Sequence, residues 1–334
     1  MIHKHKILAF LLASMASQVS VAAIADIAEM HTIFNSCVGA DGSIRCLDNK
    51  GKEDYRRLEH MTTLMKSALM ANPGDPIVRD NVLGLYNQAY STLKTHQLTP
   101  DWHLPGEIRD MGISVRRTFD GKEKFSFVVR GSTHQPHIIR QFQISHYPDQ
   151  VIIDKVAGIG EWEEQDMGKF SYGIESHRTP QKIEAGLYTL NIELENGTKT
   201  QGWFLVEDDM NATTGPAVQS PSQGETFHTG NPTFNWSNYV STQYKPYERR
   251  WFWSGVTRVE PPQYSGVEKW KVYQENPTIH QATPGIDGNF DSAADHKLLP
   301  GNYEVTFNYK ELRAFGDIEV GRASDTVRTF KVEP

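Results

Sequence analysis

The sequence is poor in cysteine and in positive charge. Its two cysteines exclude a cysteine-dense extracellular scaffold. The 34 Lys and Arg are outnumbered by 41 Asp and Glu, which gives a formal charge of −7. Because nucleic acids and anionic membrane surfaces attract basic faces, we expect neither as a partner. Hydrophobic residues make up 38% of the chain and charged residues 22%, so we expect folded domains.

The sequence also lacks the local motifs of several enzyme classes. It contains no G-x-S-x-G, no H-E-x-x-H, no phosphate-binding G-x-x-x-x-G-K-[ST] and no dinucleotide fingerprint. The fragment "GIGEW" at 158–162 has neither the third glycine nor a strand–turn–helix context. We therefore predict no catalytic residue and a protein that is not an enzyme, although triads assembled in space can escape such a search.

Long apolar runs are missing as well, and the N-terminus has the pattern of a secretory signal peptide over residues 1–25. Lys4 and Lys6 precede the apolar stretch Ile7 to Ala13, and Ala23-Ile24-Ala25 forms a small-x-small cleavage site. A membrane anchor is the alternative, but it needs about 20 apolar residues. Cleavage would remove two Lys and change the charge from −7 to −9.

Cys37 and Cys46 flank "VGADGSIR". In an oxidising compartment we expect them to form one local disulfide, which stabilises by about 2–3 kcal/mol because its loop is short. Two free or metal-bound thiols are the alternative.

A helical domain is predicted over residues 26–103. Apolar residues recur there every three or four positions, and Asp75-Pro76 is a helix start signal because Asp caps free N–H groups and Pro fits the first turn. The buried stripes that this spacing predicts are Ile27, Met30 and Phe34; Leu58, Met61, Met65 and Ala68; and Val78, Val82, Leu85, Ala89 and Leu93.

After Pro100 the apolar period changes to two, which predicts strands. Asp120-Gly121 and Asn196-Gly197 are hairpin turn signals. The polar segment 210–216 reads as a linker. We therefore expect one β unit over 104–209 and a second over 217–334, behind the helical domain, in an α+β multidomain chain.

Each β unit contains the same short pattern, "IEAGLYTLNIEL" at 183–194 and "LLPGNYEVTFNY" at 298–309. It resembles the tyrosine corner of immunoglobulin-like and fibronectin type III-like β-sandwiches, carried here by Tyr188 and Tyr303. The resemblance implies that each Tyr begins a penultimate strand and that its hydroxyl bonds backbone across the corner. The segment around "PTFNWS" is similar to the first strands of bacterial fibronectin-type modules, which implies that Trp236 is buried. A shared fold does not assign a function.

The segment "YKPYERRWFWSG" at 244–255 is rich in aromatic residues, and Tyr247, Arg249, Trp251 and Trp253 are its candidate ligand-binding residues. On a strand, Trp251 and Trp253 share one face, with Phe252 on the other. If the Trp face is exposed, it forms a platform for a sugar ring or a protein partner. If it faces the core, no platform exists.

Three clusters could bind a metal or act as acids and bases. Asp287, Asn289, Asp291 and Asp295 match positions 1, 3, 5 and 9 of a calcium loop, but Ser292 and Leu298 replace its glycine and its bidentate glutamate. We expect an acidic turn there, with calcium as the alternative. Glu161, Glu163, Glu164 and Asp166 could serve a glycoside hydrolase, and His134, His137 and His146 could bind zinc. Solvated side chains are the expectation for both clusters.

These features predict a non-enzymatic envelope protein, periplasmic or secreted, of a Gram-negative bacterium. The short leader, the resemblance to bacterial fibronectin-type modules and the few cysteines indicate the bacterial origin. We expect it to bind a protein partner or a polysaccharide through β-sandwich surfaces. The alternatives are a carbohydrate-binding protein using Trp251 and Trp253, and a periplasmic glycoside hydrolase.

Overall fold

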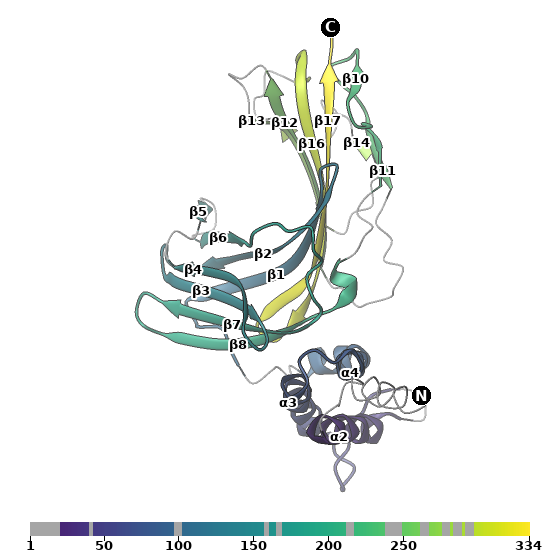
Figure 1. The fold of residues 1–334 in the computed structure, drawn as a ribbon, viewed down its shortest axis with the longest axis vertical. Coiled ribbons are helices and arrows are strands. Elements are labelled where there is room, and N and C mark those ends of the chain that lie inside the picture. The colour runs from purple at the N-terminus through teal and green to yellow at the C-terminus, as the bar shows by residue number, and fades with distance from the viewer. Residues whose placement is uncertain are drawn as a thin grey trace, which may run out of the picture.

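The chain folds into a helical N-terminal part followed by antiparallel and mixed β-sheets (Figure 1). The computed structural model describes residues 21–39, 43–96, 102–156, 160–164, 169–211, 217–237, 249–260, 267–275, 281–282, 289–290 and 297–334. No helix within these ranges is long and apolar enough to cross a membrane. The leader expected over 1–25 lies mostly outside them.

The described residues of the N-terminal part form three helices: α2 (Val21–Cys37), α3 (Arg56–Ala71) and α4 (Pro76–Thr95). The predicted start of α4 is confirmed, because the Asp75 carboxylate accepts hydrogen bonds from the backbone N–H groups of Ile77 and Val78. The predicted apolar stripes are buried, apart from Ile27, which is partly buried.

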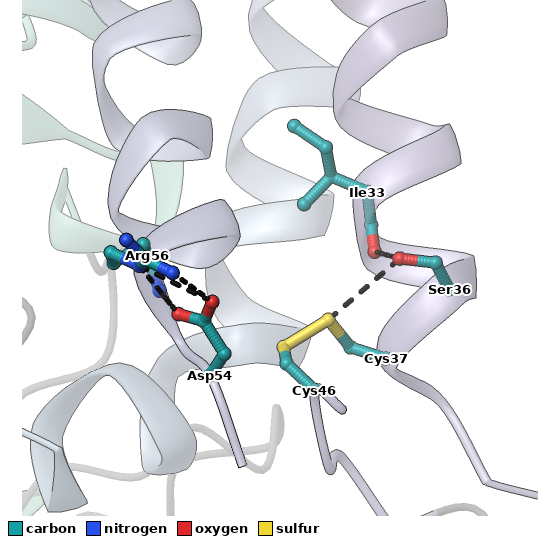
Figure 2. Close-up of a disulfide and its surroundings, with 6 residues drawn as sticks. All are labelled: Ile33, Ser36, Cys37, Cys46, Asp54 and Arg56. Atoms are coloured by element: carbon teal, nitrogen blue, oxygen red, sulfur yellow. Dashed lines mark hydrogen bonds and ion pairs between the residues drawn. A yellow bond between two sulfur atoms is a disulfide. The ribbon is translucent and has the colours of Figure 1, made fainter. Parts of the chain in front are cut away.

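The predicted disulfide joins Cys37, at the end of α2, to Cys46 (Figure 2). Beside it, the Ser36 hydroxyl donates to the Ile33 carbonyl over 2.7 Å. Arg56 donates hydrogen bonds to the Asp54 carboxylate, from Nε over 2.9 Å and from Nη2 over 2.6 Å. These hydrogen bonds lower the pKa of Asp54 to about 2. The disulfide closes the first part of the connection between α2 and α3.

The strands form one large sheet and two smaller ones. The ten-stranded sheet consists, in spatial order, of β15 (Asn289–Phe290), β13 (Val267–Glu275), β12 (Arg249–Glu260), β16 (Gly301–Phe315), β17 (Ile318–Val332), β1 (Ile108–Phe119), β2 (Glu123–Thr133), β6 (Lys169–Glu175) and β5 (Gly160–Glu164), with β10 (Glu225–Phe227) beside β17. The four-stranded sheet is β4 (Gln150–Val156), β3 (Ile139–His146), β7 (Gly186–Leu194) and β8 (Lys199–Val206). The three-stranded sheet is β14 (Gln281–Ala282), β11 (Phe234–Ser237) and β9 (Ala217–Ser220).

The four-stranded sheet packs on β1 and β2 in a first sandwich. The Phe127 ring of β2 lies 5.1 Å from that of Tyr188 on β7 and 6.3 Å from that of Phe204 on β8. The glycines of the two predicted hairpin turns, Gly121 and Gly197, have φ of 94° and 86°, which glycine adopts readily. Both hairpins are confirmed.

The three-stranded sheet packs on β12, β16 and β17 in a second sandwich. Trp236 of β11 is buried, as predicted, and its ring stacks on that of Phe252 at 4.5 Å. Phe234 contacts Phe307 at 6.4 Å and Phe330 at 5.4 Å. A second apolar core, distinct from the first, results.

The hairpin of β16 and β17 links the two sandwiches. Each of its strands has 15 residues. The first half of β17 pairs with β1 in parallel, from Gly112 opposite Glu319 to Phe119 opposite Thr326. Phe315 and Ile318, at the turn, belong to the first core, whereas Tyr303 and Phe330 belong to the second. The division into 104–209 and 217–334 stays a prediction, and this hairpin contributes side chains to both cores.

A buried polar cluster fixes the turn of this hairpin to the helices. Arg313 is 3% exposed and binds the Glu207 carboxylate, which follows β8, and the Asn87 side chain of α4. Its guanidinium also lies over the rings of Tyr86 and Tyr90, at 5.1 and 5.2 Å. The cluster therefore joins α4, β8 and β16.

Both predicted tyrosine corners have the expected geometry. Tyr188 and Tyr303 are each 1% exposed and lie near the starts of β7 and β16. The Tyr188 hydroxyl donates to the Glu184 carbonyl over 2.7 Å, and that of Tyr303 to the Leu299 carbonyl over 2.6 Å. The two rings belong to different sheets, so the repeated pattern marks one corner in each sandwich.

Replacing either corner tyrosine should destabilise the chain. Tyr188→Phe and Tyr303→Phe each remove one hydroxyl that satisfies a backbone carbonyl, so each should lower the free energy of unfolding by about 1 kcal/mol. Urea denaturation followed by circular dichroism measures the change. Tyr55→Phe is the control, because the ring of Tyr55 stacks on His96 and the substitution keeps the ring. It should leave the free energy of unfolding unchanged. Equal stability of all three variants and the parent would contradict the role of the corners.

Candidate functional site

The candidate site is the face of the ten-stranded sheet that lies opposite both cores. Phe252 is 1% exposed and points into the second core, and the next residue, Trp253, is partly exposed. Successive side chains of a strand point to opposite faces, so Trp253 lies on the other face. Residues that pair in register lie on the same face of a sheet. The pairs between β12, β16, β17, β1 and β2 therefore extend this face from Trp253 to β2.

This face lies on the inside of a bend, and we call it the concave face. In Figure 1, β12, β13, β16 and β17 rise at an angle from β1 and β2, with β10, β11 and β14 on one side of them. The four-stranded sheet lies below β1 and β2. Both covering sheets are thus on the outside of the bend, and the concave face spans both sandwiches.

The indole ring of Trp253 lies over a glycine two residues further along its own strand. A Cβ atom built on Gly255 would lie 2.5 Å from Cζ2 of the indole, closer than atoms can approach. The ring therefore occupies the space that a side chain at position 255 would need. The exposed part of such an indole offers an apolar surface to a ligand.

The residues beside Trp253 on β16 and β17 are polar, whereas on β13 it pairs in register with Tyr273. Trp253 pairs in register with Asn308, and Asn308 with Asp325, so the three residues form a row across β12, β16 and β17. The Asn308 amide donates to the Asp325 carboxylate. An aromatic ring next to planar polar groups is a combination that suits a ligand with both apolar faces and hydroxyl groups.

An ion-pair network extends this row toward β6. Arg116 of β1 places Nε 3.3 Å from Asp325 and Nη1 3.4 Å from Glu175. Glu175 also accepts hydrogen bonds from Ser126, at 2.9 Å, and from Arg178, at 2.8 Å. Burial alone would raise the pKa of Glu175, but the hydrogen bond from Arg178 and the charge of Arg116 outweigh it and lower the pKa. The contribution of Glu175 to the stability of the folded chain is therefore present at neutral pH and is lost as falling pH protonates its carboxylate.

The structure describes only part of the aromatic segment that the sequence singled out. Tyr247 lies outside the described residues. Arg249 and Trp251 lie on β12, but their side chains are not among those described. Phe252 is buried and Trp253 is partly exposed, and the presence of Trp251 beside Trp253 stays a prediction.

The predicted metal and acid clusters fall largely outside the described residues. Asp287, Asp291 and Asp295 are among those left out, and Asn289 is placed only by its backbone on β15. Glu161, Glu163 and Glu164 lie on the edge strand β5 with their side chains undescribed, and Asp166 falls outside. Within the described ranges, no group of three metal-binding side chains occurs. His146 is buried instead against Tyr188, at a ring distance of 4.8 Å.

Sequence reasoning missed Arg116, Glu175, Asn308 and Asp325. Arg116, Glu175 and the hairpin that carries Asn308 and Asp325 come from three regions of the chain that are far apart. None carries a local motif, and the pairing of β17 with β1 brings the hairpin residues next to Arg116.

Comparisons with known proteins do not assign a family. No family model matches the chain, and no curated protein matches it. Solved structures with some likeness are a Salmonella alpha-2-macroglobulin (10% identity, 69% of this chain and 15% of that chain, TM-score 0.23), the FN1–FN3 domains of chicken CNTN1 (12%, 70% and 69%, 0.19) and the Yersinia pseudotuberculosis adhesin InvE (10%, 67% and 60%, 0.16). The chain thus spans only 15% of the first of them. TM-scores this low carry no conclusion about function.

The exposure of Trp253 can be measured in solution. The partly exposed indole of Trp253 should be quenched by acrylamide, whereas that of Trp236, 2% exposed, should be shielded. Trp253→Phe should therefore lower the quenchable share of the fluorescence. Trp236→Phe is the matched control and should raise that share. If Trp253→Phe leaves the quenchable share unchanged, the ring is buried and the concave face has no platform.

Proposed function

We propose that this protein is an exported, non-enzymatic binding protein and that its ligand surface is the concave face. The observation that carries the proposal is the partly exposed ring of Trp253, which lies over Gly255 beside Asn308 and the network of Arg116. The signal-peptide pattern and the Cys37–Cys46 disulfide support export to an oxidising compartment.

A glycan is the ligand class that this face favours. Stable protein interfaces have an apolar core, but the neighbours of Trp253 on β16 and β17 are Asn308 and Asp325. The large apolar side chains that are exposed among the described residues lie elsewhere: Val21, Ile24, Val38, Leu47, Met70, Ile77, Val151 and Leu299. A sugar ring can stack on the indole while its hydroxyl groups bond the adjacent polar side chains. A protein partner is the alternative.

The charged groups of this face favour binding over hydrolysis. A glycosidase needs a carboxylic acid whose pKa is raised. Glu175, which is partly buried on the concave face, has a lowered pKa because Arg178 and Arg116 hold its ionised form. The Glu161–Glu164 cluster, which carries the hydrolase alternative, lies on β5 at the far edge of the sheet.

Binding should depend on the Trp253 ring. We expect immobilised protein to retain envelope or matrix polysaccharide, and Trp253→Ala to weaken retention about tenfold, since loss of a stacked ring costs about 1.4 kcal/mol. Val151→Ala, an exposed position of β4 outside the concave face, is the control and should bind like the parent.

Two outcomes would contradict this proposal. Retention of no polysaccharide by the folded parent protein would reject the glycan, and equal retention by Trp253→Ala would reject the site. A photo-crosslinker at position 253 that captures one protein reproducibly in cells would identify the protein partner as the correct alternative.

A further inference from the structure

A column of three polar side chains on β16, Glu304, Thr306 and Asn308, runs beside the Trp253 ring. All three are partly exposed, and they alternate along the strand with residues of the second core. Because successive side chains of a strand point to opposite faces, the column lies on the concave face. Asn308 pairs in register with Trp253. Thr306 pairs with Gly255, which the indole covers, so the column and the indole are neighbours on adjacent strands.

Each member of the column keeps a hydrogen-bond acceptor that no described residue occupies. The Asn308 amide donates from Nδ2 to the Asp325 carboxylate, which fixes the orientation of the amide and leaves Oδ1 as an acceptor. The Thr306 hydroxyl and the Glu304 carboxylate make no side-chain hydrogen bond or ion pair with a described residue. A carboxylate and an amide oxygen accept hydrogen bonds and donate none. The column therefore calls for a ligand that supplies donors.

The charges of the concave face do not favour an anionic ligand. Cations and carboxylates are mixed on it: Arg116, Arg130 and Lys310 lie among Asp110, Glu175, Glu319 and Asp325. The strand β13 adds one charge of each sign, Glu268 and Lys271, in register with β12. Near the indole, Glu304 presents a carboxylate without an ion-pair partner among the described residues. This carboxylate would repel a polyanion on the platform but not an uncharged chain.

A neutral polysaccharide supplies the groups that complement this column. Each of its sugar rings has hydroxyl groups around the edge, which donate hydrogen bonds, and an apolar face that can stack on an indole. From Glu304 to Asn308 the column covers four residue steps of about 3.4 Å, or about 14 Å. This is longer than one sugar ring, so a ligand that contacts the whole column is a chain lying along β16. At Asn308 the chain comes next to Asp325 and, through it, to the network of Arg116.

We propose that the ligand is a neutral, hydroxyl-rich polysaccharide, with one sugar ring stacked on Trp253 and hydroxyl groups of the chain donating to Glu304, Thr306 and Asn308. This inference rests on the function proposed above and specifies its ligand class. Glu304 has a second role, because its charge discriminates against acidic chains. Asp325 acts as a positioning residue, since it holds the Asn308 amide with Oδ1 available to the ligand.

Polygalacturonate and its fully methyl-esterified form provide a matched test, because esterification removes the carboxylate charge and keeps the sugar rings. We expect the full-length mature protein to bind the ester at least tenfold more tightly than the acid. Dextran and dextran sulfate form a second pair, and we expect the neutral dextran to bind more tightly. The affinity for the neutral polymers should not change as salt is raised, because salt screens interactions between charges.

Thr306→Val tests the column, because valine keeps the branched shape and removes the hydroxyl. No described residue bonds that hydroxyl, so the fold should persist, and circular dichroism verifies it. The affinity for the neutral polymers should fall about fivefold, the effect of one hydrogen bond. Thr200→Val is the matched control: it changes a partly exposed threonine of β8, on the four-stranded sheet, and should bind like the parent.

Glu304→Gln tests the discrimination against acidic chains. Glutamine keeps an acceptor oxygen and removes the charge, so the acidic polymer should gain affinity while the neutral one keeps its own. We expect the ratio of the two affinities to fall at least threefold. Glu195→Gln, at an exposed position of the turn after β7, is the matched control and should leave the ratio unchanged.

The outcomes separate this inference from the proposed function. Acidic polymers that bind as tightly as the neutral ones, with binding still lost in Trp253→Ala, would overturn the neutral ligand and leave the glycan-binding function standing. Failure to bind either neutral polymer would also overturn the neutral ligand. If Thr306→Val binds like the parent, or if Thr306→Val and Thr200→Val lose affinity equally, the column is not the site and the inference is rejected.

Discussion

The parallel pairing of β1 with the first half of β17 is the constraint on which the rest of the structure depends. It runs from Gly112 and Glu319 to Phe119 and Thr326. Without it, β16 and β17 would belong to the second sandwich alone. With it, one sheet passes through both sandwiches, both cores lie on one of its faces, and the concave face becomes a single continuous surface.

The polar cluster at the hairpin turn supports this arrangement. Burying Arg313 and Glu207 removes both charges from water, a cost that their attraction offsets only when the geometry is good and further hydrogen bonds are made. Asn87 bonds both partners, and two tyrosine rings flank the guanidinium. Loss of one partner from such a pair costs about 3–5 kcal/mol. The cluster therefore disfavours any arrangement in which the hairpin turn leaves α4 and β8.

Local chemistry made much of the fold predictable. The cap at Asp75, the glycine turns at 121 and 197, the local disulfide and the two tyrosine corners each depend on residues within about ten positions of one another, and all are present in the structure. The buried Trp236 followed from the resemblance of its segment to known sandwiches.

The long-range pairings were not predictable in the same way. The residues of β1 and β17 that pair are about 200 positions apart, and their apolar alternation fits many partners equally well. The site shares this property: Trp253 was visible as part of an aromatic segment, whereas Arg116, Glu175 and Asp325 became neighbours only through the register. Which face Trp253 occupies was open in the sequence, and the burial of Phe252 decided it.

The central claim is that one surface, shared by both sandwiches, forms one binding site. An NMR titration of the full-length mature protein with an oligosaccharide of the polysaccharide that it retains tests it most directly, with the indole N–H of Trp253 and the Nε–H group of Arg116 as reporters. The account predicts that both signals shift and reach saturation along one common curve. A shift confined to Trp253 or to Arg116, or two curves with different midpoints, would contradict it.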